Sequence, residues 1–203
     1  MNEKENKEQK KCLICGKAVV ELKGGICEPC QERIRREAPG EQADVRSQME
    51  RALKLFQEAY HCQMEGDLER AMVLYRESIH CRPTAEAHTF LGWTFSFLSR
   101  YDEAIEQCKK AIAVDPDFGN PYNDIGAYLI NLGKLDEAIP WLQKAVQARR
   151  YEAYHYPHCN LGRVYLAKGM LKKALEEFEK ALAIEPNYRP AREAIEAIQQ
   201  QLQ

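Results

Sequence analysis

The chain has 203 residues, of which 45% are hydrophobic and 30% charged, and its net charge is -2. These values favour one ordinary folded domain or two small ones, and they argue against a disordered chain or one that mainly neutralises nucleic-acid phosphates. No apolar run approaches the roughly 18 residues of a membrane span, and the polar N-terminus lacks the apolar core of a secretory signal. We therefore expect a cytoplasmic protein without a membrane segment, whose 8 cysteines do not form disulfides.

Four of the cysteines lie close together near the N-terminus. They are Cys12, Cys15, Cys27 and Cys30. Each C-x-x-C pair places two thiolates on one tight turn, and two such pairs complete the four-sulfur shell that zinc prefers. The segment resembles the short zinc-ribbon family, although its pairs are closer together in sequence than is usual. The resemblance implies one structural Zn²⁺ in a closed site that folds a small module and does not catalyse.

The surroundings of this module do not favour nucleic acid as a partner. A basic spot at Arg33, Arg35 and Arg36 follows the last cysteine pair, but the chain up to residue 46 carries 10 basic and 9 acidic side chains. We therefore expect a solvated helix face there. Two alternatives stay open: a zinc-ribbon-mediated, nucleic-acid-associated adaptor linked to transcription or translation, with the rest of the chain serving assembly, and a redox role for the C-x-x-C thiols.

The rest of the chain repeats itself with a period of about 34 residues. Alanines at the same place in four related segments, Ala71, Ala104, Ala138 and Ala174, are separated by 33, 34 and 36 residues. Twelve residues before them stand equally small residues: Ala59, Gly92, Gly126 and Gly162. Small residues at fixed points let two antiparallel helices approach closely, so the period predicts a solenoid of helical hairpins.

This pattern resembles the tetratricopeptide repeat (TPR) family, whose small, apolar and proline positions it follows over roughly residues 50–188. We predict an all-α solenoid preceded by the zinc module. The expected parts are a disordered tail (1–10), the four-cysteine module (11–37), a linker (38–46), a TPR-like domain (47–203) with repeats at about 52–84, 85–118, 119–152 and 155–188, and a capping helix (189–202). The longest gap indicates about two extra residues near Arg149–His155.

The resemblance implies a concave groove lined by the first helix of each repeat. It places the groove positions at Phe56, Tyr60, Thr89, Trp93, Ser96, Asn123, Ala127, Ile130, Cys159, Arg163 and Leu166. Aromatic residues in the N-terminal half suit apolar anchors of a bound peptide or helix, although Phe56 and Trp93 have an equally good reading as packing residues. Chaperone-tail binding is disfavoured, because Phe56 and Tyr60 replace the Lys and Asn of that TPR class, and Asp124 would repel a carboxylate.

The remaining reactive residue types fit packing better than chemistry. By their place in the repeat, Cys62, Cys81 and Cys108 are predicted to be buried, and His88 and His158 to pack between helices. No phosphate-binding loop or nucleophile elbow is present in the sequence, and a second metal site near His155–Cys159 lacks a complete ligand set. We therefore predict a non-enzymatic scaffold or adaptor whose partner is another protein. The sequence leaves its oligomeric state open.

Overall fold

The computed structural model describes residues 10–11, 18–19 and 39–201, and the chain divides into two compact units, Met1–Glu50 and Arg51–Gln203. In the first unit, strand β1 (Lys10–Lys11) pairs antiparallel with β2 (Ala18–Val19). The four predicted zinc ligands, and the predicted tail up to residue 9, lie outside the described residues.

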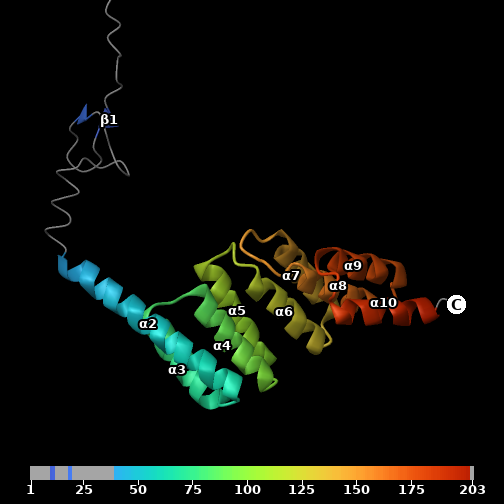
Figure 1. Ribbon diagram of the computed structural model, residues 1–203, viewed down its shortest axis with the longest axis horizontal. Helices are drawn as coiled ribbons and strands as arrows, with labels where there is room; N and C mark the ends of the chain where they lie inside the picture. The colour runs from blue at the N-terminus through green and yellow to red at the C-terminus, as the bar shows by residue number, and fades with distance from the viewer. Residues whose placement is uncertain (1–9, 12–17, 20–38, 202–203) are drawn as a thin grey trace, which may run out of the picture. The chain divides into compact units, whose positions relative to one another are not determined.

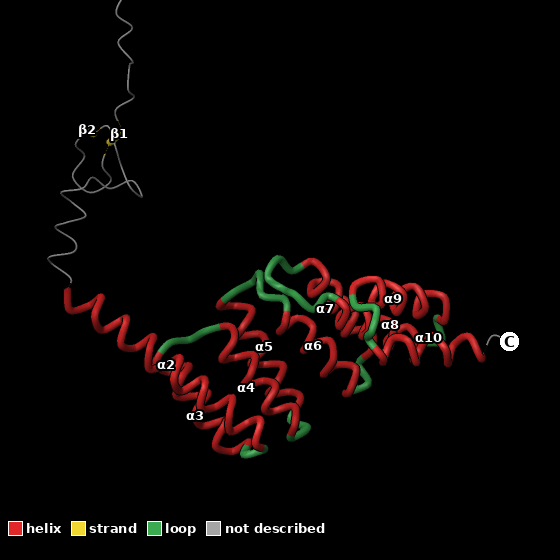
Figure 2. Tube along the Cα trace, viewed as in Figure 1, coloured by secondary structure: helices red, strands yellow, loops and turns green. Residues whose placement is uncertain are grey.

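The second unit is built from helices (Figures 1 and 2). The helices, the first of which begins in the first unit, are α2 (Pro39–Glu65), α3 (Leu68–Cys81), α4 (Ala85–Phe97), α5 (Tyr101–Val114), α6 (Asn120–Asn131), α7 (Leu135–Gln147), α8 (His155–Ala167), α9 (Leu171–Ile184) and α10 (Arg189–Gln201). None of the described helices is long and apolar enough to cross a membrane. The predicted four hairpins and terminal helix are thus present, with α10 packed against α9.

The predicted linker at 38–46 needs correction, because helix α2 already begins at Pro39. Proline is tolerated in the first turn of a helix, where its missing N–H would have no partner anyway. Ion pairing between Arg46 and Glu50, one turn apart, and the Gln48–Asp44 hydrogen bond support the helix beyond this point. The Pro-Gly pair therefore starts a helix here instead of marking a break.

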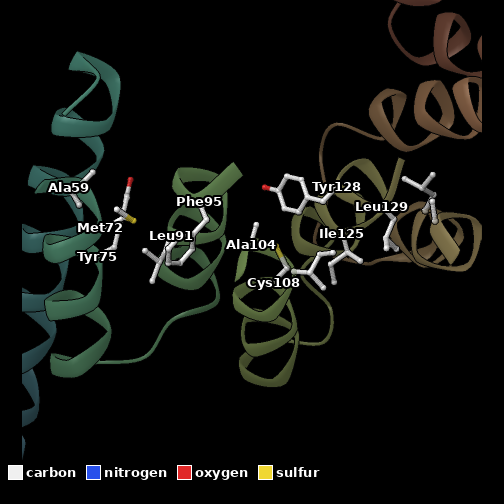
Figure 3. Packing of buried hydrophobic residues seen from close by; sticks show 14 of the residues in the cluster. Ala59, Met72, Tyr75, Leu91, Phe95, Ala104, Cys108, Ile125, Tyr128 and Leu129 are labelled. Atoms are coloured by element: carbon white, nitrogen blue, oxygen red, sulfur yellow. The ribbon is translucent and has the colours of Figure 1, made fainter. Parts of the chain in front are cut away.

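Close approach of the two helices in each hairpin explains the repeated small residues. The side chains of Ala71, Ala104, Ala138 and Ala174 are fully buried. Opposite them, a Cβ added at Gly126 would lie 2.4 Å from a Leu142 methyl carbon, and one added at Gly162 would lie 2.7 Å from the Phe178 ring. Large side chains of successive hairpins then pack together in a core that runs from α2 to α8, part of which Figure 3 shows from α2 to α6, and a second cluster joins α8, α9 and α10.

The predicted burial of the scattered cysteines is confirmed for Cys62 and Cys108 and wrong for Cys81. Desolvation raises the pKa of the Cys108 thiol well above its usual value, in keeping with an inert core residue. Cys81 ends α3 and is half-buried, and Val114 and Ile184 at the same place in later repeats are exposed. This position lies in the last turn of the second helix, where the hairpin no longer covers it.

The turn inside each hairpin requires a left-handed backbone conformation. Glycine supplies it at Gly66, Gly133 and Gly169, with φ between 71° and 86°, whereas Ser99 occupies the same place in the second repeat with φ 57°. A residue with a Cβ pays a steric cost in this region that glycine avoids. Ser99 is therefore a strained position in an otherwise regular turn.

Replacing Ser99 by glycine is expected to stabilise the domain by about 0.5–1 kcal/mol, because the steric relief exceeds the extra unfolded-state entropy of glycine. Gly133→Ser, the reverse change at the matching turn, is expected to destabilise by a similar amount. Urea unfolding followed by circular dichroism measures both. If the two variants shift the unfolding midpoint in the same direction, the strain assignment is wrong.

Candidate peptide-binding pocket

A pocket of about 330 Å³ lies on the face formed by the first helices of the hairpins. Helix α4 contributes Thr89, Phe90 and Trp93, helix α6 contributes Asn120, Asn123 and Asp124, and the segment from Tyr151 to Tyr156 supplies Tyr151, Ala153 and Tyr156. The pocket therefore combines aromatic rings, amides and one carboxyl group. We call it the Asp124 pocket.

The extra residues predicted near Arg149–His155 form one wall of this pocket. The connection between α7 and α8 pairs with the α5–α6 connection, since the Arg150 N–H donates to the Asp117 carbonyl at 2.9 Å and the Gly119 N–H donates to the Arg150 carbonyl at 3.0 Å. Gly119 allows this approach, because a Cβ there would lie 2.5 Å from the Tyr151 side chain. Figure 2 shows the two connections near each other at the same end of the helices.

Arg150 joins the α7–α8 connection to the α5–α6 connection through its side chain. Its guanidinium lies 2.8 Å from the Glu86 carboxylate and 2.7 Å from the Asp115 carboxylate, and it stacks 4.0 Å above the centre of the Phe118 ring. Ordinary surface ion pairs contribute little, but one guanidinium shared by two carboxylates and a ring forms a network with better geometry. The arginine that replaces the usual proline of the repeat thus orients the wall that carries Tyr151.

A chain of hydrogen bonds connects helix α8 to the acid in the pocket. Arg163 donates to the Asn160 side-chain oxygen at 3.0 Å, and the Asn160 amide donates to the Asn123 oxygen at 2.9 Å. The Asn123 amide in turn points toward Asp124 over a longer distance of 3.4 Å. These bonds fix the orientation of the Asn123 side chain at the pocket surface.

The carboxyl group of Asp124 has a raised pKa. Desolvation by the surrounding side chains raises the pKa of its carboxyl group to about 7, and the Asn123 amide opposes this only in part. Asp124 takes part in none of the ion pairs among the residues that the structure describes. Its charge is therefore uncompensated in the free protein.

An aromatic cluster continues from the pocket toward the N-terminal hairpin. The Phe90 ring packs edge-on against Phe56, Tyr60 and Trp93, with ring centres 5.2 to 5.7 Å apart, and Trp93 packs against Phe97. Tyr60, Trp93 and Phe97 remain 43%, 38% and 52% exposed. The cluster is thus anchored in the core through Phe90 while one side of it faces solvent.

The predicted groove residues occupy three kinds of place. Thr89, Trp93 and Asn123 line the pocket, and Phe56 and Tyr60 belong to the aromatic cluster. Cys159, predicted to face the groove, is buried in the core between α8, α9 and α10. The others do not line the pocket: Ser96, Ala127, Ile130, Arg163 and Leu166. A role of any of them in binding stays a prediction.

Six of the nine residues that line the pocket were missing from the predicted groove set: Phe90, Asn120, Asp124, Tyr151, Ala153 and Tyr156. Phe90 lies one position from predicted Thr89, and no repeat motif singles it out. Tyr151 and Tyr156 lie in or next to the extra residues, where the repeat pattern assigns no position. The insertion, with Tyr151 and Tyr154 inside it and Tyr156 just after it, was the signal in the sequence that pointed to this wall.

The histidines that were expected to pack between helices do so through polar contacts. His88 Nδ1 lies 2.9 Å from the Gln107 oxygen, and His158 Nδ1 lies 2.7 Å from the Glu177 carboxylate. Both pairs join the two helices of a hairpin across the same 19-residue separation. No group of three or more metal-ligating side chains occurs within residues 10–11, 18–19 and 39–201.

The pKa of Asp124 predicts how stability depends on pH. An unfolded aspartate titrates near 3.9, so the folded state is penalised progressively as the pH rises from about 4 to 7. Relative to Asp124→Asn, the wild-type chain should lose about 2 kcal/mol of stability between pH 5 and pH 8, after allowance for partial solvent access. Urea unfolding of both proteins at the two pH values measures this. Parallel pH profiles would show that Asp124 ionises normally.

The comparison with known proteins agrees with the helical hairpins. Residues 85–118 and 117–186 each match a family model described as tetratricopeptide repeat. A stretch of 53 residues is 38% identical to the small glutamine-rich tetratricopeptide repeat-containing protein 2 of Mycosarcoma maydis. That match covers 26% of this chain and only 15% of the relative. The relative's wider properties therefore do not follow from it.

Several solved structures share the fold. A Pseudomonas aeruginosa pilF structure aligns with a TM-score of 0.72 and 26% identity, over 76% of this chain and 70% of its own. A MamA crystal structure aligns with a TM-score of 0.61 and 26% identity, over 70% and 83%. The first TPR of Spaghetti (RPAP3), bound to the HSP90 peptide SRMEEVD, aligns with a TM-score of 0.54 and 25% identity, over 59% and 93%. The two family-model matches, which together span residues 85–186, show that the chain belongs to the tetratricopeptide repeat family.

Proposed function

We propose that this protein is a non-enzymatic adaptor that holds a peptide or helix of a partner protein on the face formed by α4, α6 and α8. TPR folds serve protein–protein interaction, and the observation that carries the proposal is the continuity between the Asp124 pocket and the exposed aromatic cluster. Trp93 belongs to both. Exposed aromatic rings beside a pocket are typical anchors of protein interfaces.

Trp93 is the strongest anchor candidate. Its ring is held between Phe90 and Phe97, so little side-chain entropy remains to be lost when a partner covers it. At the same time 38% of the residue is exposed. A rigid ring with an uncovered face can bury apolar area against a partner without rearranging the core.

The pocket also indicates which sign of charge a bound partner segment carries. The HSP90 peptide bound to the RPAP3 repeat contains the acidic residues of the sequence SRMEEVD. In this chain, Asp124 lies in the pocket, while Phe56 and Tyr60 form part of the aromatic cluster. A carboxylate entering the pocket would meet another carboxylate in a desolvated place, so we infer a partner other than an acidic chaperone tail.

Loss of partner capture in Trp93→Ala tests the proposal. The tagged full chain is used for affinity purification with quantitative mass spectrometry, beside Trp93→Ala and the control Val114→Ala, which removes an exposed apolar side chain at the end of α5. We expect Trp93→Ala to reduce the specific partner at least tenfold, since anchor residues contribute 2 kcal/mol or more, and Val114→Ala to leave it unchanged. Equal capture by all three proteins would contradict the proposal.

We further propose one structural Zn²⁺ held by Cys12, Cys15, Cys27 and Cys30, on the chemistry of the two C-x-x-C pairs alone. Native mass spectrometry of the full chain is expected to find one zinc ion per chain, lost in Cys27→Ser. The matched control is Cys81→Ser, which removes a free thiol of the repeat domain and should retain the ion. Metal-free wild-type protein with reactive C-x-x-C thiols would instead support the redox alternative.

A further inference from the structure

We propose that the Asp124 pocket receives one basic side chain, lysine or arginine, of the partner peptide. This inference rests on the proposed function and specifies the chemistry of the bound segment. It follows from three features of the pocket: one unpaired carboxyl group, aromatic walls and enclosed polar groups whose orientation is fixed.

The charge of the pocket is negative and open to a partner. Asp124 is the one carboxylic acid among the lining residues, and none of the lining residues is basic. Of the arginines on the neighbouring elements, Arg150 pairs with Glu86 and Asp115 and Arg163 donates to Asn160, while the exposed Arg149 does not line the pocket. Within the described part of the chain, no ion pair includes Asp124, so a counter-charge for its ionised form would come from the ligand.

The walls of the pocket suit the long stem and charged head of a basic side chain. Phe90 and Trp93 line it from α4, Tyr151 from the connection between α7 and α8, and Tyr156 from the first turn of α8. Aromatic faces attract ammonium and guanidinium groups electrostatically and also cover the apolar stem. The volume of about 330 Å³ lies at the small end of ligand pockets, which fits one side chain better than a folded element.

The polar groups beside Asp124 limit what else could enter. The Asn123 oxygen accepts from Asn160 and its amide points toward Asp124, while the Thr89 hydroxyl donates to the Ala85 carbonyl at 2.7 Å. The Thr89 hydroxyl hydrogen and one Asn123 N–H are thereby engaged, so that both groups offer oxygen lone pairs to a ligand, while the Asn120 amide and the tyrosine hydroxyls can donate or accept. The Asp124 carboxylate and these oxygen acceptors favour a ligand rich in N–H donors over an acidic side chain.

Desolvation of Asp124 makes the binding depend on pH. In the free protein its pKa is about 7, so a cation must bind the ionised form and drive a proton off. The other titratable groups facing Asp124 are Cys108 on α5, Tyr128 on α6 and Tyr151 on the connection, and burial raises the pKa of each further from neutrality. The lining residues of α4 are not titratable, and α8 presents Tyr156 and, through the Asn160 bond, Arg163.

A peptide-array experiment with the full chain tests this inference. Wild-type protein, Asp124→Asn and the charge control Glu137→Gln, an exposed acid on α7, are bound to an array of random twelve-residue peptides. The best wild-type binders are then synthesised with each Lys or Arg replaced by norleucine, and Kd is measured by fluorescence anisotropy at pH 6 and pH 8.

We expect wild-type binders to share one Lys or Arg whose replacement weakens binding about tenfold or more, as loss of a charged contact does. The same replacement should have little effect on Asp124→Asn, so that the double-mutant cycle is non-additive. For wild-type protein the affinity should rise about tenfold from pH 6 to pH 8, because the ionised fraction of Asp124 rises by that factor. Asp124→Asn should not show this rise, and Glu137→Gln should behave as wild type.

The failures of the two proposals are distinguishable. Wild-type binders without a required basic residue, or with one that Asp124→Asn still recognises equally well, would overturn the pocket assignment and leave the adaptor proposal intact. If no peptide binds more strongly to wild type than to Trp93→Ala, the groove itself is not a peptide site. That result would overturn both.

Discussion

The close contact between the two helices of each hairpin is the constraint on which the rest of this structure depends. Fully buried alanines face glycines whose missing side chains leave room for Leu142 and Phe178. Because the helices touch at these points, the large apolar side chains lie to either side and interlock with the next hairpin (Figure 3). The regular stacking then places α4, α6 and α8 beside one another, since α6 contacts both of its neighbours. The pocket exists because of that alignment.

One departure from regularity gives the solenoid its distinct site. The connection between α7 and α8 leaves the repeat pattern, pairs with the α5–α6 connection and brings Tyr151 against Gly119. Arg150 fixes this arrangement by bridging Glu86 and Asp115. The resulting wall lines the pocket beside the half-buried Asp124, and desolvation by the surrounding side chains raises the pKa of its carboxyl group. Packing that serves stability in the other repeats thus produces a specific electrostatic environment here.

Much of the fold was predictable because the same residue pattern recurs in four segments, so that each segment supports the interpretation of the others. Alanines and glycines recurring at about 34 residues have one common physical explanation, so hairpins, their number and the terminal helix followed from spacing. The prediction failed where a local signal had two meanings. The segment 38–46 was predicted to be a linker but contains the start of α2 at Pro39, and Cys81 was assigned to the core although it lies at a helix end. Cys159 was assigned to the groove and is buried by α9 and α10. In each case a contact with another helix, or its absence, decided the outcome.

The sequence by itself determined the family, the hairpin order and the presence of two paired thiol motifs, because these depend on residue type and spacing. Only the tertiary structure decided that Phe90, Trp93, Asn123, Asp124 and Tyr151 meet in one pocket. Trp93 and Asn123 were expected in a groove from their repeat positions, and Phe90 and Asp124 are one repeat apart, but Tyr151 comes from an insertion to which the repeat pattern assigns no position. The acidity of Asp124 belongs to the same category, since a pKa is set by the groups that surround a carboxyl in space and by the water they exclude.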